Sequence, residues 1–137
     1  MANAHVVLLY AGILGLLLVV LSFNMMKSWV RVAGQGEQRD LDLHRAEALI
    51  GSFTDYVPLT LLLMAGAEAS GAPALALHIL GASLVVARLM HAFGSNRLRS
   101  SDALRFLGAQ ITYLVLTVAS FSCLFFYAMP TLVGSVK

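Results

Sequence analysis

Two basic side chains, Arg88 and His91, lie inside the apolar segment LHILGASLVVARLMHAFG (residues 77–94). A spacing of three residues places both on one face of a helix, one turn apart. A charge in such a segment is costly, so it is expected to face protein and to have a partner or a ligand. The planar guanidinium of an arginine suits an anionic group. Arg88 is therefore the first candidate for binding an anionic ligand.

The composition indicates whether the protein is surrounded by water or by lipid. Of 137 residues, 59% are hydrophobic and 12% are charged, and the mean hydropathy is +0.83. In soluble domains about a quarter of all residues are charged, so we expect this chain to be a polytopic membrane protein. Its length predicts a single domain over residues 1–137. The net charge of +2 and the scattered basic residues argue against nucleic acid as a partner. The lone Cys123 lies in an apolar stretch and is expected to be unreactive.

The apolar runs predict an all-α bundle of four transmembrane helices. About twenty residues cross the hydrocarbon, and the runs with this length cover residues 6–26, 48–69, 74–93 and 104–129. The first run is a span rather than a signal peptide, because its start has no Lys or Arg and no cleavage pattern follows it. The polar segment 27–47 is expected to be a loop in which a helix can restart near Asp40. Residues 70–73 form a tight turn, and Pro130 is expected to end the fourth helix.

The basic residues predict the orientation. The segments joining the first helix to the second and the third to the fourth lie on one side of the membrane. With the helix ends they contain Lys27, Arg31, Arg39, Arg45, Arg97, Arg99 and Arg105. The positive-inside rule places these basic loops in the cytoplasm and both termini outside.

Asp55 is the expected partner of Arg88. Each lies roughly 10 Å inside the cytoplasmic end of its predicted helix, and the two helices are adjacent and antiparallel. A pairing within or between subunits is therefore expected, because an unpaired charge there would cost several kcal/mol. Two interpretations remain: a structural ion pair, or a polar cavity open to the cytoplasm with His91, Ser95, Arg97 and Arg105 nearer its mouth. Glu68 is expected to be an interfacial or subunit-contact carboxylate, and His78 a helix-packing or interfacial residue.

The sequence lacks the motifs that most classes of catalytic or metal site require. No two histidines have the i, i+3 or i+4 spacing of a metal site, no Gly-rich phosphate loop is present, and no elbow motif positions a serine nucleophile. A transporter would show repeats or broken helices at the midplane, and neither is visible. A cationic site facing the cytoplasm, with apolar walls reachable from lipid, suits an anionic, water-soluble cosubstrate that meets a lipophilic partner.

The motifs of helices two to four resemble the MAPEG family, the membrane-associated proteins in eicosanoid and glutathione metabolism. The resemblance rests on Asp55-Tyr-Val-Pro58, Glu68, Gly71, Leu77-His78, Gly81, Arg88-Leu-Met-His91-Ala-Phe-Gly94 and Arg105-x-x-Gly108-x-x-x-Thr112. It implies a four-helix protomer of the bacterial inner membrane, a homotrimer, and glutathione bound between subunits near the cytoplasmic face. The residues implied in glutathione binding are Arg45, Ser52, Asp55, Arg88, His91, Arg97 and Arg105. The family usually has Asn and Glu where this chain has Ser52 and Asp55.

The resemblance implies a glutathione-dependent transferase or peroxidase that acts on lipophilic electrophiles or lipid hydroperoxides. Arg88 or Arg105 would stabilise the thiolate, and Ser52 or Ser95 would donate a hydrogen bond to it. The alternative is a non-catalytic membrane protein of the same fold that binds lipid, since the family contains such a member.

Overall fold

Four helices form the part of the chain that the structure describes. The computed structural model describes residues 5–31, 37–94 and 102–134, with side chains over 5–27, 44–94 and 102–129. The helices are α1 (Val6–Arg31), α2 (Glu37–Ala69), α3 (Ala74–Gly94) and α4 (Asp102–Gly134). Each contains a segment long and apolar enough to cross a membrane: Val6–Lys27, His44–Ala69, Ala74–Gly94 and Asp102–Met129. The predicted all-α bundle of four transmembrane helices is confirmed.

Two predicted boundaries are wrong. Most of the 27–47 segment is helical rather than loop, because α1 continues to Arg31. The helix restart expected near Asp40 does occur, with α2 beginning at Glu37. A polar sequence can continue a helix beyond the apolar run, and only Gly34 and Gly36 strongly disfavour helix in this segment. In the same way α4 passes Pro130 and ends at Gly134. Proline removes one backbone hydrogen bond, and neighbouring groups can satisfy the freed carbonyl.

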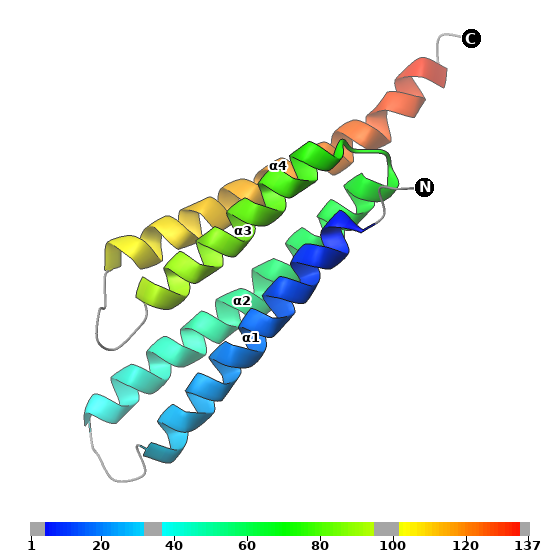
Figure 1. Cartoon of the computed structure of the whole chain (residues 1–137). Coiled ribbons are helices and arrows are strands. Elements are labelled where there is room, and N and C mark those ends of the chain that lie inside the picture. Colours follow the sequence, from blue (N-terminus) through cyan, green and yellow to red (C-terminus); the bar gives the residue numbers. More distant parts are fainter. Residues whose placement is uncertain (1–4, 32–36, 95–101, 135–137) are drawn as a thin grey trace.

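The helices run antiparallel to their sequence neighbours (Figure 1). In that view α1 lies alongside α2, and α3 lies alongside α4; α2 also contacts α4, and α1 contacts α3. The end of α1, the start of α2, the end of α3 and the start of α4 share one end of the bundle. The segments predicted to be the two basic loops are therefore bounded by helix ends on the same side of the protein.

The turn between α2 and α3 has the geometry that its sequence predicts. The Gly71 N–H donates to the carbonyl of Glu68 and the Ala72 N–H to that of Ala67, the pattern of a Schellman motif. Gly71 has φ 91°, the left-handed conformation that glycine adopts without strain. Ala72 is buried against Ala67, so the turn is fixed by packing as well as by hydrogen bonds. The prediction of a tight reversal at 70–73 is confirmed.

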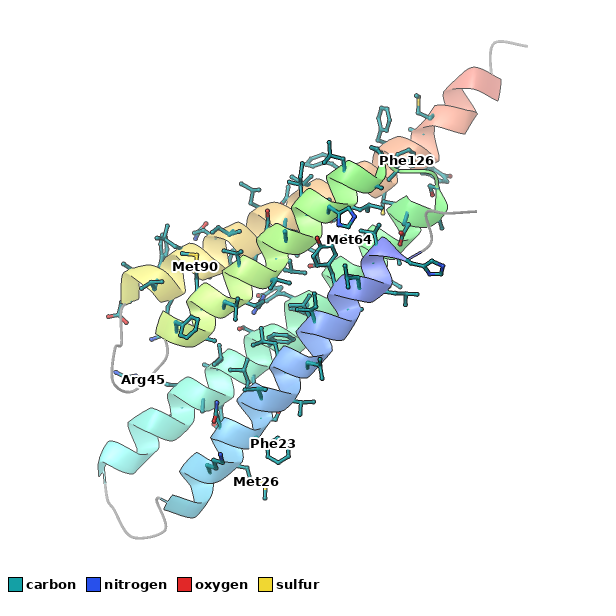
Figure 2. The ribbon with its side chains drawn as sticks, in the orientation of Figure 1. Phe23, Met26, Arg45, Met64, Met90 and Phe126 are labelled. Carbon is teal, nitrogen blue, oxygen red and sulfur yellow. The ribbon has the colours of Figure 1, made fainter. Side chains whose placement is uncertain are left out.

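The buried side chains form two clusters along the bundle. The cluster near the turn includes Met64, Leu77 and Ala119, and the central cluster includes Leu14 and Leu84. Outside them, α1 and α4 expose many large apolar side chains, as Figure 2 shows for Phe23 and Met26, while Met64 lies among the helices. This distribution is expected of a chain whose surroundings are lipid or another subunit.

Candidate functional site

Arg88 lies on the buried face of α3. That face also carries Leu77, Gly81, Leu84 and Ala87, at the spacing of a single helical stripe. The arginine is 2% exposed, so its long side chain is enclosed by the bundle. Its Nη1 donates a hydrogen bond to the Ser52 hydroxyl of α2 at 3.3 Å.

Phe53 and Leu49 complete the surroundings of this hydrogen bond on α2. The guanidinium carbon of Arg88 lies 5.5 Å from the centroid of the Phe53 ring, a distance at which a cation is attracted to the face of an aromatic ring. Ser52 in turn donates its own hydroxyl hydrogen to the carbonyl of Leu49 at 3.1 Å. Among the side chains that the structure describes, α2 thus offers Arg88 a hydroxyl oxygen and an aromatic face, and no carboxylate.

The expected pair of Asp55 with Arg88 does not form within the protomer. Among the described residues no ion pair joins the two side chains, and Asp55 is exposed. The cause is helical phase: Phe53 and Val57 face the core, and a residue two positions from Phe53 points about 200° away from it. Ser52 is on the side of α2 that faces Arg88, and Asp55 is not. Pairing with another subunit is not tested by a single chain.

Two buried guanidinium nitrogens lack a hydrogen-bond partner in the part of the chain that the structure describes: the Nε atoms of Arg88 and Arg105. Buried polar groups without partners are few in native proteins, and each one calls for an explanation. Arg105 also contacts Asp102 at 3.5 Å, through Nη1, where the carboxylate is almost fully exposed. Each arginine therefore keeps one enclosed donor nitrogen that makes no hydrogen bond with the described residues.

A close helix contact brings three basic side chains together. At Gly108 of α4, an added Cβ would lie 2.6 Å from the backbone carbonyl oxygen of Ala87 and 2.9 Å from the backbone nitrogen of His91, both in α3. This approach places His91 within electrostatic range of both Arg88 and Arg105. Arg88, His91 and Arg105, each predicted from the sequence to be a site residue, lie together at the α3–α4 contact. We call these three residues the basic cluster.

Two tyrosines beside the basic cluster were missed as site residues by the sequence reasoning. The rings of Tyr56 (α2) and Tyr113 (α4) meet edge to face, with centroids 5.2 Å apart and planes at 88°. Both lie within electrostatic range of Arg88. A signal was present in the sequence: Tyr56 follows Ser52 by four residues, one helical turn, and tyrosines of membrane helices are enriched at the two interfaces rather than at the middle.

The remaining predicted site residues have different outcomes. Arg45 projects from α2 close to the end of the bundle where α3 ends and α4 begins (Figure 2). Ser95 and Arg97 lie outside the described residues. No group of three or more His, Cys, Asp or Glu side chains that could hold a metal ion occurs in the described segments.

The polar residues at the opposite end of the bundle have structural contacts. The Glu68 carboxylate accepts hydrogen bonds from the backbone N–H groups of Val6 and Val7, at 3.0 and 3.3 Å. It thereby caps the start of α1, where the helix dipole favours a negative charge; within the protomer this is the contact that Glu68 makes. His78 packs against Tyr10, whose hydroxyl lies 3.1 Å from the His78 Nδ1, which confirms helix packing for this histidine.

Comparison with known proteins identifies the family to which this bundle belongs. The profile of the MAPEG family matches residues 7–125, a stretch that contains the basic cluster and both tyrosines. The chain belongs to the MAPEG family. It is thus a MAPEG integral membrane protein with four spanning helices.

The curated relatives of this MAPEG protein are bacterial. The inner membrane protein YecN of Escherichia coli strain K12 is 35% identical over 88 residues, which cover 63% of this chain and 66% of YecN. YecN of Escherichia coli O6:H1 (strain CFT073) matches to the same extent. The chain therefore matches just under two thirds of the length of these relatives. No solved structure matches the chain.

Proposed function

We propose that this MAPEG protein is a glutathione-dependent transferase or peroxidase that acts on lipophilic electrophiles or lipid hydroperoxides. The main support for the proposal is the basic cluster, in which two buried arginine nitrogens have no hydrogen-bond partner among the described residues. Glutathione presents two carboxylates and a thiol. An arginine binds a carboxylate through two parallel hydrogen bonds, and such charge-assisted bonds are the strong ones.

In this proposal the basic cluster binds the carboxylates of glutathione and lies on the side of the ligand that faces the membrane interior. Arg45 and Arg97 are further carboxylate ligands near the end of the bundle, and Asp55 is an acceptor for the glutathione ammonium group. Arg88 anchors the ligand, since it is fixed by Ser52 and Phe53 and is enclosed by protein. Arg105 has a side chain 35% exposed, so it reaches outward to a ligand more readily than Arg88 does.

The reaction requires a thiolate, because the thiol itself is a weak nucleophile. Arg105 or Arg88 stabilises the negative charge on sulfur. A hydroxyl from Ser52 or Ser95 donates a hydrogen bond to it; for Ser52 this means turning the hydroxyl away from the Leu49 carbonyl. The thiolate then attacks a substrate that arrives through the bilayer, where the exposed apolar side chains of α1 and α4 meet lipid.

We also propose a homotrimer in which α2 contacts a second copy. The exposed face of α2 carries several small residues and Asp55 beside two large apolar side chains, Leu59 and Leu62, whereas the exposed faces of α1 and α4 carry many large apolar side chains. The exposed small residues are Ala48, Gly51, Thr54, Ala65, Gly66 and Ala69, and Asp55 lies beside Thr54. Membrane helices associate through such small residues, and a second subunit would shield Asp55 from lipid. The number three comes from the family resemblance alone.

For the location, we propose the bacterial inner membrane, with both basic segments in the cytoplasm and both termini outside. The support is the similarity to YecN, an inner membrane protein, together with the positive-inside rule. The helix ends that border both basic segments share one end of the bundle, as this orientation requires.

A non-catalytic lipid-binding protein is the second candidate. The observation that favours it is that Ser52 already bonds Arg88 and Leu49, while Asp55 points out of the protomer. The two polar residues of α2 are thus not presented together to a ligand of the same protomer.

Reconstituted protein distinguishes the two candidates. Proteoliposomes are supplied with glutathione and dodecyl iodide, and the thioether product is measured against protein-free liposomes. We expect a rate above that of the uncatalysed reaction, and its loss in Arg105→Leu but not in Lys27→Gln, which removes an exposed cation of α1. No catalysed conjugation by folded protein, with lipid retained through purification, would instead support lipid binding.

A further inference from the structure

Tyr56 and Tyr113 lie at similar depths within their membrane-spanning helices. Tyr56 is twelve residues after His44, where the α2 span begins, and Tyr113 is eleven residues after Asp102, where the α4 span begins. At 1.5 Å per residue each tyrosine is roughly 16–18 Å from the end of its span, well inside spans of 26 and 28 residues. Arg88 lies about 9 Å from the end of its span at Gly94, on the cytoplasmic side of the tyrosines in the proposed orientation.

The two tyrosines differ in how far their side chains are exposed. Tyr113 is 43% exposed, and its ring stands edge to face against the half-buried Tyr56. The pair joins α2 to α4, two helices that are not neighbours in sequence. An exposed phenol hydroxyl inside a membrane span would meet little water, so it would need a polar partner there. The exposed member of the pair, Tyr113, can contact a molecule that arrives through lipid.

We propose that the Tyr113 hydroxyl donates a hydrogen bond to the reacting oxygen of the lipophilic substrate, while Tyr56 positions its ring. This inference rests on the proposed glutathione chemistry and names its second substrate. The substrate class is electrophiles in which an oxygen gains negative charge as sulfur attacks, such as unsaturated aldehydes and lipid hydroperoxides. Donors aimed at a developing oxyanion act strongly in a water-excluded site. Arg88, within electrostatic range of both phenols, adds a positive charge on the same side.

The reaction with an unsaturated aldehyde is balanced without an oxidant. The thiolate sulfur forms a bond to the β carbon, and the electron pair of the carbon–carbon π bond moves to the oxygen, giving an enolate. The Tyr113 O–H bonds this oxygen. A proton equivalent to the one lost by the thiol then adds to the α carbon, so the net change is addition of the thiol across the double bond.

An alkyl iodide is the matched control substrate, because it reacts without any oxygen. Sulfur forms a bond to carbon, the carbon–iodine bond breaks, and iodide leaves with the electron pair. The Tyr113 hydroxyl has no role in this reaction. The ratio of the rates with nonenal and with dodecyl iodide therefore reports on the hydroxyl alone.

The test uses Tyr113→Phe, which keeps the ring contact and removes the hydroxyl. We expect kcat/KM for nonenal to fall by roughly 10²-fold, with dodecyl iodide conjugation and glutathione affinity within about twofold of wild type. Tyr127→Phe changes a tyrosine of the same helix that is 76% exposed and lies outside the pair, and both rates should stay at the wild-type value.

The position of Tyr56 is tested through its ring. Tyr56→Leu should lower the nonenal rate selectively, and Tyr56→Phe should restore it, because phenylalanine keeps the edge-to-face contact. An equal loss for both substrates in Tyr113→Phe, or no loss for either, would overturn the inference while leaving glutathione transfer intact. Wild-type protein that conjugates neither substrate would overturn the proposed function and this inference with it.

Discussion

Arg88 donates a hydrogen bond to Ser52, with Nη1 3.3 Å from the hydroxyl oxygen, in place of an ion pair with Asp55. A neutral acceptor leaves the guanidinium charge uncompensated within the described part of the protomer. Because Arg88 is also enclosed by protein, its field is screened less than that of a surface arginine. The arrangement suits a side chain that binds an anion, and it is poorly explained by a purely structural ion pair.

Replacing Ser52 tests the acceptor role of its hydroxyl. In Ser52→Ala a buried donor of Arg88 loses its partner, and we expect a loss of about 1–3 kcal/mol in the free energy of unfolding. Thr54→Ala is the matched control, since Thr54 is exposed and bonds the Ile50 carbonyl of its own helix. Unfolding in mixed micelles of detergent and dodecyl sulfate measures both variants. Equal stability of the two would show that the hydrogen bond contributes little.

Gly108 is predicted to hold α3 and α4 at their close distance. A methyl group there would meet the Ala87 carbonyl oxygen at 2.6 Å, so Gly108→Ala should destabilise the bundle by about 1–3 kcal/mol. Gly12→Ala has nothing within 4 Å of the new methyl group and should be neutral or stabilise by about 0.5–1 kcal/mol, as alanine does within helices. Thermal unfolding in detergent gives the two signs. Stabilisation by Gly108→Ala would contradict the contact.

The proposed α2 interface predicts that Gly51 limits assembly. Gly51 has nothing within 4 Å of an added Cβ in the protomer, so Gly51→Leu should fold normally and hinder only the contact with a second copy. We expect a smaller mass in mild detergent by light scattering, with unchanged helix content by circular dichroism. Gly12→Leu on α1 should keep the wild-type mass. Wild-type protein that is a folded monomer would refute the interface.

Single-cysteine labelling tests the orientation in a Cys123→Ser background. Ser100→Cys, in the connection between α3 and α4, should react with an impermeant thiol reagent only after the membrane is opened. Ser70→Cys, in the opposite turn, should react in intact cells. Ser70 is preferable to Gly71, whose φ of 91° would strain a cysteine. Reaction of both positions from one side would rule out the proposed topology.

The fold follows from the sequence because hydrocarbon thickness sets the length of apolar runs. The turn at Gly71 and the α3 span were predicted closely for this reason. The errors fell where lipid imposes no constraint: the polar helical ends around Arg31 and Glu37, and the continuation of α4 past Pro130.

The site was predicted in part. Arg88, His91 and Arg105 were found because charges in apolar helices are conspicuous, and the structure brings them together. The partner of Arg88 was misjudged because membrane depth places Asp55 correctly while helical phase turns it outward. The Tyr56–Tyr113 contact joins α2 and α4, and no local pattern in the sequence shows which helices will meet.

Calorimetric titration of glutathione into the detergent-purified protein tests the central claim, that Arg88 anchors an anionic ligand. Wild type and Lys27→Gln should bind glutathione, and Arg88→Leu should bind at least tenfold more weakly, because a hydrogen bond to a charged group contributes about 1.5–3 kcal/mol. The double variant Arg88→Leu/Asp55→Leu should keep the wild-type mass and helix content and lose at least as much glutathione affinity, because it also removes the proposed acceptor for the ammonium group. Unchanged glutathione affinity in the folded Arg88→Leu variant would confine Arg88 to a structural role and contradict the account.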